Sequence, residues 1–88
     1  MTARQRQIAQ QILEALNMMD GGQLPEVVLH AEVNLRIKPN AGLAEFEDAL
    51  KVCDRQGWAT GVLPKFGGSR LWNLSDAGQA ARLEMGKA

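Results

Sequence analysis

The side chains best suited to catalysis are few in this sequence and do not combine into a reactive set. His30 is the only histidine and Cys53 the only cysteine, so a histidine-based metal cluster is excluded. Cys53 falls on the apolar side of a predicted helix, where we expect a small core residue and not a nucleophile. The sequence therefore predicts no enzyme activity, no metal and no cofactor.

Two other patterns that could carry chemistry also lack the context they need. Gly67-Gly68-Ser69 is glycine-rich, but it does not join a strand to a helix as a phosphate-binding loop does. Glu47 and Asp48 are adjacent carboxylates, yet they project in different directions from a helix and cannot act as an acid–base pair. Binding, and not catalysis, is the function class that remains.

Basic residues gather in one part of the chain, although the whole chain carries ten basic and ten acidic residues. Between residues 35 and 70 there are six basic residues against four acidic ones. Such side chains bind phosphate backbones without regard to base sequence, so they are the candidate nucleic-acid-binding residues: Arg36, Lys38, Lys51, Arg55, Lys65 and Arg70. The net charge of zero argues against nucleic-acid binding, because a dedicated DNA-binding domain is usually basic.

The first element that must position these residues is a helix over about residues 4–19. Its apolar residues recur at three- and four-residue spacing, which predicts one buried stripe, made of Ile8, Ile12, Ala15, Leu16 and Met19. Asp20-Gly21-Gly22 is expected to end this helix, because glycine readily adopts the C-terminal left-handed conformation.

Residues 24–38 are consistent with either a strand or a helix. Apolar and polar residues alternate from Val27 to Lys38, which is a strand pattern. A helix is also consistent, with Pro25-Glu26 as its first turn and one apolar face formed by Val27, Val28, Ala31 and Leu35. We choose the helix because the fold indicated by the rest of the chain requires one here. A strand would instead give a helix, a long strand, a helix and a hairpin.

A turn at residues 38–42 leads to a third predicted helix over residues 43–56. Its buried stripe is expected to consist of Leu43, Phe46, Ala49, Leu50 and Cys53, and its exposed face of Ala44, Glu47, Asp48, Lys51 and Arg55. The spacing allows Lys51 to pair with Glu47 or Asp48, as on an ordinary solvated helix.

The last third of the chain predicts a hairpin and a final helix. Residues 58–63 and 70–74 are the strands, and Gly67-Gly68 supplies the positive φ angles of the tip. Trp72 and Leu74 share one face and should point into the core. Ser75 should cap the last helix, in which Gly78 permits close packing and a thin apolar stripe is formed by Ala77, Ala80, Ala81 and Leu83.

Eighty-eight residues indicate a single domain spanning positions 1–88. A domain of this size has a modest core, so a homodimer is a further expectation. The sequence holds no membrane-spanning run. Polar residues follow Met1 directly and one cysteine cannot form an internal disulfide, so a cytoplasmic location is expected.

The chain resembles the winged helix-turn-helix superfamily. Three segments carry the resemblance: Glu45-Phe46 through Leu50, Gly57-Trp58, and the run from Trp72 to Gly78, which is similar to the W-x-L-T-x-x-G ending of many bacterial and phage winged-helix domains, with Ser75 in place of threonine. The resemblance implies an α+β fold with a three-helix core, a β-hairpin wing and a C-terminal helix. It also implies a small DNA-binding or regulatory protein of bacterial or phage type.

The resemblance would make the third helix the recognition helix, but its exposed face is acidic in the half nearest a duplex. We therefore expect double-stranded DNA to be bound mainly through Lys65 and Arg70 on the wing, and through Arg36 and Lys38 before the third helix. We expect none of these four cations to have an acidic partner nearby in the sequence. Phe66 at the wing tip is expected either to fold back on the sheet or to contact a partner. The alternative function is a winged helix that binds a protein partner and no DNA.

Overall fold

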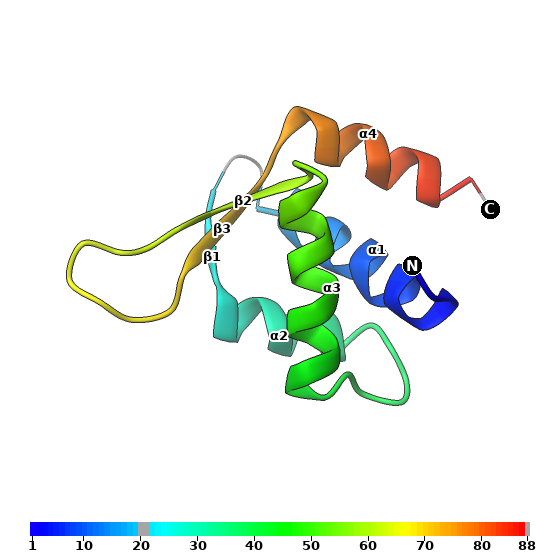
Figure 1. Cartoon of the computed structure of the whole chain (residues 1–88), viewed down its shortest axis with the longest axis horizontal. Helices are drawn as coiled ribbons and strands as arrows, with labels where there is room; N and C mark the ends of the chain where they lie inside the picture. Colours follow the sequence, from blue (N-terminus) through cyan, green and yellow to red (C-terminus); the bar gives the residue numbers. More distant parts are fainter. Residues whose placement is uncertain (20–21, 88) are drawn as a thin grey trace.

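The computed structural model describes residues 1–19 and 22–87, in which four helices pack beside a small antiparallel sheet (Figure 1). The helices are α1 (Ala3–Asn17), α2 (Glu26–Asn34), α3 (Leu43–Arg55) and α4 (Asp76–Met85). The strands are β1 (Leu24–Pro25), β2 (Ala59–Val62) and β3 (Leu71–Leu74). The predicted α+β class and the predicted hairpin wing are confirmed.

Helix α1 begins at a capping box and contributes one buried face to the core. The Thr2 hydroxyl accepts from the Gln5 amide, and the Gln5 side chain accepts from the Thr2 amide, which satisfies two free N–H groups of the first turn. Its predicted stripe is buried from Ile8 to Leu16, but Met19 is 40% exposed and does not belong to it. Asp20 and Gly21 of the predicted stop lie outside the described residues.

Residues 26–34 form a helix, as predicted, but the apolar face on which that prediction rested is not the buried face. Leu29 and Val33 are fully buried, whereas the exposed side of α2 carries Val27, Val28, Ala31 and Leu35. Helix α2 has two apolar stripes, and the strand that precedes the helix determines which of them faces the core. Strand β1 pairs with β3 immediately before α2, which fixes the rotation of the helix about its axis.

Helix α3 presents its predicted faces, apart from its first residue. Phe46, Ala49, Leu50 and Cys53 are buried, while Leu43 is 61% exposed because it lies at the first position of the helix. The predicted outer face, from Ala44 to Arg55, is exposed throughout.

The sheet has the order β1-β3-β2, so β3 is its central strand. Trp72 of β3 is opposite Leu24 of β1 and Gly61 of β2, and it is only 4% exposed, as predicted. The two-residue strand β1 was not expected, because so short a segment has no alternation pattern to detect.

Helix α4 starts at Ser75, whose hydroxyl accepts from the Gly78 amide, as predicted. Gly78 is buried against the backbone of Trp58, and a Cβ atom at this position would overlap the Trp58 carbonyl oxygen. Of the predicted stripe of this helix only Ala81 packs against the core, since Ala77, Ala80 and Leu83 are exposed. The close approach at Gly78 turns Gly78 and Met85 toward the core instead.

Candidate nucleic-acid interface

Figure 1 shows the hairpin projecting from the body of the molecule, and a groove lies between this hairpin and α3. We call the hairpin from Ala59 to Leu74 the wing, and this depression the wing groove. It is lined by Glu26, Glu47, Leu50, Lys51, Asp54, Gly68, Ser69, Arg70 and Trp72. Of the six candidate cations, the groove brings together two, Lys51 and Arg70.

The floor of the wing groove is held by a contact between α2 and the sheet. The Trp72 Nε1–H donates to Glu26 Oε1 over 3.0 Å, and the guanidinium carbon of Arg70 lies 6.0 Å from the Trp72 ring centroid. This contact ties the first residue of α2 to the central strand. It also leaves a carboxylate beside Arg70, which the sequence reasoning missed because 46 residues separate Glu26 from Trp72.

The charge of the wing groove is mixed. Its lining contains three carboxylates, those of Glu26, Glu47 and Asp54, against the two cations Lys51 and Arg70. Lys51 has no carboxylate oxygen within 4.0 Å among residues 1–19 and 22–87, so the predicted pairing of Lys51 with Glu47 or Asp48 is not formed. The wing groove is therefore not a continuous positive surface.

The wing tip is both cationic and apolar. Phe66 is 94% exposed, so the alternative in which it folds back on the sheet is wrong. The Lys65 ammonium lies 5.7 Å from the Phe66 ring centroid, within cation–π range. Gly67 and Gly68 have φ angles of 86° and 99°, the left-handed geometry that a glycine tip was expected to supply. The tip therefore offers one positive charge and one aromatic ring to a partner.

Arg36 is engaged within the protein, contrary to the expectation that it has no acidic partner. Its Nη1 lies 3.1 Å from Glu32 Oε2 and also donates to the Glu32 carbonyl oxygen, and its side chain is 22% exposed. The four-residue spacing of Glu32 and Arg36 is a helical pairing signal that is visible in the sequence, although the expectation of a free Arg36 did not take it into account. Lys38 remains exposed and donates to Asn40 Oδ1 over 3.3 Å.

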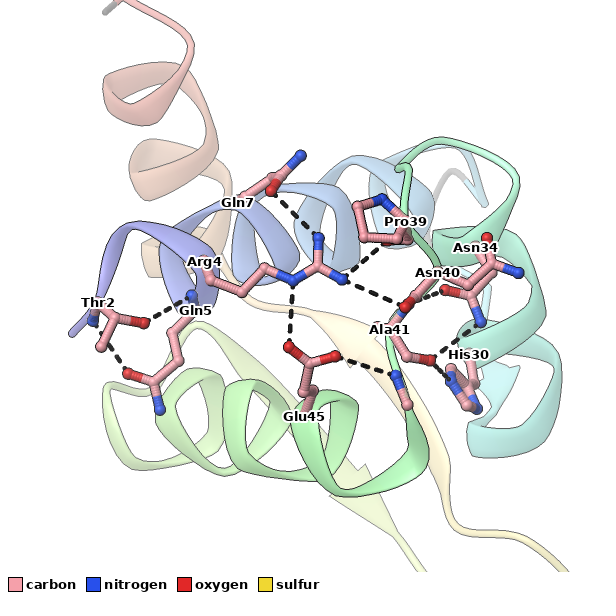
Figure 2. Close-up of polar contacts among 11 residues, drawn as sticks. Thr2, Arg4, Gln5, Gln7, His30, Asn34, Pro39, Asn40, Ala41 and Glu45 are labelled. Carbon is pink, nitrogen blue, oxygen red and sulfur yellow. Dashed lines mark hydrogen bonds and ion pairs between the residues drawn. The ribbon is translucent and has the colours of Figure 1, made fainter.

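Side chains from α1 and α2 fix the turn that leads into α3 (Figure 2). His30 Nε2 lies 2.8 Å from the Ala41 carbonyl oxygen. Asn34 bonds the same residue twice, since its Oδ1 accepts from the Ala41 amide and its Nδ2 donates to the Ala41 carbonyl. The His30 ring stacks on Phe46 with 4.6 Å between centroids. This set holds the start of α3 in a defined position relative to α2.

Arg4 clamps the other side of the same turn (Figure 2). Its guanidinium donates to the carbonyls of Pro39 and Asn40 and lies 3.2 Å from Glu45 Oε2, while Glu45 Oε1 accepts from the Gly42 amide. Arg4 and the Gly42 amide hold the pKa of the Glu45 carboxyl below its ordinary value. Arg4 is thus a structural cation, and its role depends on contacts more than 30 residues away.

The remaining candidates are separate from one another. Arg55 lies in the last turn of α3 and Lys65 at the wing tip, and neither lines the wing groove. Cys53 is fully buried in the core, as expected, and this burial raises the pKa of its thiol to about 12. In the described part of the chain no group of His, Cys, Asp and Glu residues could hold a metal ion. No helix there is long and apolar enough to cross a membrane.

Comparison with known proteins shows relatives in structure only. No family model matches the sequence, and no curated protein matches it. A MarR-family transcriptional regulator from Silicibacter pomeroyi superposes with a TM-score of 0.71 and 18% identity, over 90% of this chain and 48% of the regulator. SSV1 F-93 superposes with a TM-score of 0.66 and 15% identity, over 97% of this chain and 83% of F-93.

This chain spans about half the length of the MarR-family regulator, so the likeness concerns one part of that protein. At these identities the likeness shows the fold and leaves the partner undefined. The element order, the hairpin and the two structural neighbours agree on the architecture that the sequence resemblance implied. The chain has the winged helix-turn-helix fold.

Proposed function

We propose that this winged helix binds double-stranded DNA, with the wing as the main phosphate contact. The observation that carries the proposal is the distribution of unpaired cations. Four of the ten basic residues have a carboxylate within 4.0 Å, namely Arg4, Arg36, Arg82 and Lys87. Within residues 1–19 and 22–87, the other six have no such partner. Four of these six lie on α3 and the wing, namely Lys51, Arg55, Lys65 and Arg70, whereas Arg6 lies on α1 and Lys38 in the turn before α3.

The carboxylates in the wing groove define the proposed mode of binding. Glu47 and Asp54 lie on α3 and line the wing groove. Because α3 corresponds to the recognition helix of this fold, which would enter a major groove, these carboxylates would repel phosphates. Lys65 and Arg70 therefore supply contacts to the backbone, which orient the protein and carry little sequence information. The proposed complex is of modest affinity and strongly salt-dependent. A role in transcription regulation agrees with the description of the MarR-family neighbour.

Fluorescence anisotropy with a labelled duplex of generic sequence tests this proposal through the salt dependence of binding. Each phosphate contact contributes about 0.9 to the slope of log K against log salt. Lys65→Ala with Arg70→Ala should therefore lower the slope by about 2 and weaken binding for all sequences. Asp48→Lys should strengthen binding, because it replaces an exposed negative charge on α3 with a positive one.

Arg82→Ala is the matched control, because it also removes a positive charge but one that Glu14 already neutralises at 3.2 Å. It should leave the salt slope unchanged. Absence of binding by the unaltered protein at tens of micromolar and low salt would overturn the DNA proposal. A control variant that weakens binding as much as the wing variant would overturn the role given to the wing.

A protein-binding module is the second candidate, and the wing tip is the observation that favours it. Phe66 is almost fully exposed, and a large exposed aromatic ring is a common anchor of protein interfaces. The same titration separates the two functions. If generic duplex is not bound, Phe66 and the mixed charges of the wing groove become the surface on which a protein partner is to be sought.

A further inference from the structure

Helix α2 is apolar on both of its sides, although only one of them faces the core. Leu29 and Val33 are fully buried. We call the opposite side, formed by Val27, Val28, Ala31 and Leu35, the α2 outer face. Val27 is 69% exposed, Val28 42% and Leu35 76%. A helix that is hydrophobic all round is normally buried all round, so this helix lacks a neighbour on its outer side.

The end of α1 extends this apolar surface. Met18 is 68% and Met19 40% exposed, and a shallow hollow lined by Ala15, Met18, Met19, Leu24 and Glu32 joins them to α2. The Arg36 guanidinium donates to the Met18 sulfur and pairs with Glu32. The charges that border the surface therefore neutralise each other within one chain.

We propose that the α2 outer face is the interface of a homodimer, in which two copies of α2 pack antiparallel about a two-fold axis near Ala31. Val27 and Leu35 lie four residues before and four residues after Ala31, so all three share one helix face. A two-fold axis at Ala31 places Val27 of one protomer against the partner's Leu35, and the reverse. Such a self-complementary surface is what a symmetric dimer requires.

The central alanine and the charge balance favour a second copy as the occupant. A small residue at the crossing point lets two helix axes approach to about 8 Å. The chain has a formal net charge of zero, so no long-range repulsion opposes association of identical copies. Val27 and Leu35 are equidistant from Ala31, so an identical copy can cover both of them with the same two side chains.

The available area supports a weak but specific dimer. The large side chains of the α2 outer face with Met18 and Met19 expose roughly 400 Å² of apolar surface, within the range of the largest patch on a typical monomer. Two copies with their polar rims would bury about 1,000 Å², the lower limit of a specific interface. The dissociation constant should therefore lie in the micromolar range or above.

The proposed interface and the wing groove are separate surfaces. No residue of the α2 outer face lines the wing groove, so a dimer formed through α2 leaves the wing accessible. The dimer does not rest on the proposed function, and its test contains no nucleic acid.

Sedimentation equilibrium over protein concentrations from about 5 to 500 μM tests the proposal. The mass should rise from the monomer value of 9.6 kDa toward twice that value. Leu35→Glu should keep the protein monomeric over the whole range, because it places a charge in the contact. Leu83→Glu is the matched control, since Leu83 is 54% exposed on α4, and it should dimerise normally. Far-UV circular dichroism should show that both variants are folded.

A charge-pair variant tests the antiparallel arrangement itself. Val27→Lys combined with Leu35→Glu places opposite charges in contact across the proposed two-fold axis, so association should return relative to Leu35→Glu alone. A protein that stays monomeric at 500 μM, or a dimer that Leu35→Glu leaves intact, overturns the interface. Failure of the double variant to restore association contradicts the antiparallel pairing.

Discussion

Replacement of Trp72 by alanine should remove most of the stability of this domain. Trp72 is 4% exposed, lies on the central strand opposite Leu24 and Gly61, and donates its indole N–H to Glu26. Truncation of a buried tryptophan costs about 3–5 kcal/mol through lost contacts and the cavity left behind. The Glu26 carboxylate can regain water, so its lost hydrogen bond adds little.

This cost is large beside the stability expected for so small a protein, which is about 5 kcal/mol. The melting temperature of Trp72→Ala should fall by about 20 °C or more, since each kcal/mol corresponds to about 4–8 °C in a domain of this size. Urea denaturation followed by far-UV circular dichroism measures the loss, and the fluorescence of the remaining Trp58 gives a second probe.

Two milder variants distinguish the contribution of the packed Trp72 ring to stability from that of its hydrogen bond. Trp72→Phe keeps an aromatic ring and should lose less than half as much stability as Trp72→Ala. Glu26→Gln keeps an acceptor oxygen for the indole N–H and should cost less than about 1 kcal/mol. If Trp72→Ala melts within a few degrees of the unaltered protein, the packing role given to this side chain is refuted.

Two further predictions concern close packing elsewhere in the core. Gly78→Ala should destabilise the protein by about 1–3 kcal/mol or more in urea denaturation, because its methyl group would overlap the Trp58 carbonyl oxygen; unchanged stability would show that α4 can move away freely. Cys53 is fully buried and its pKa is raised to about 12, so the thiol should react with a thiol reagent at pH 8 only after unfolding; rapid labelling of the folded protein would contradict its placement.

The sequence predicted α1, the wing tip and the start of α4 well because each of them carries a local signal. The stripe from Ile8 to Leu16, the glycine tip and the Ser75 cap each depend on residues within a few positions of one another. The close approach at Gly78 was also expected. Periodicity could not decide which side of α2 faces inward, because both sides are apolar and the choice depends on the pairing of β1 with β3.

The candidate interface was less predictable, because whether a charged side chain is paired depends on residues that are distant in the sequence. The contact of Arg4 with Glu45 and that of Trp72 with Glu26 join residues 41 and 46 positions apart, and no local pattern reveals them. Arg36 is different, since its pairing with Glu32 follows from helical spacing. Its removal from the set of free cations shifts the proposed phosphate contacts toward the wing.

The wing and the α2 outer face, the two proposed binding surfaces, are both supported by the same small core. A wing that binds phosphate must project from the body, and it is anchored through Trp72 at the central strand. A dimer through α2 must keep Leu29 and Val33 buried while the other side of the same helix is covered by a partner. Because Glu26, the first residue of α2, holds the Trp72 indole, both surfaces depend on the position of this helix. Covering the α2 outer face would therefore stabilise the base of the wing, even though the two surfaces share no residue.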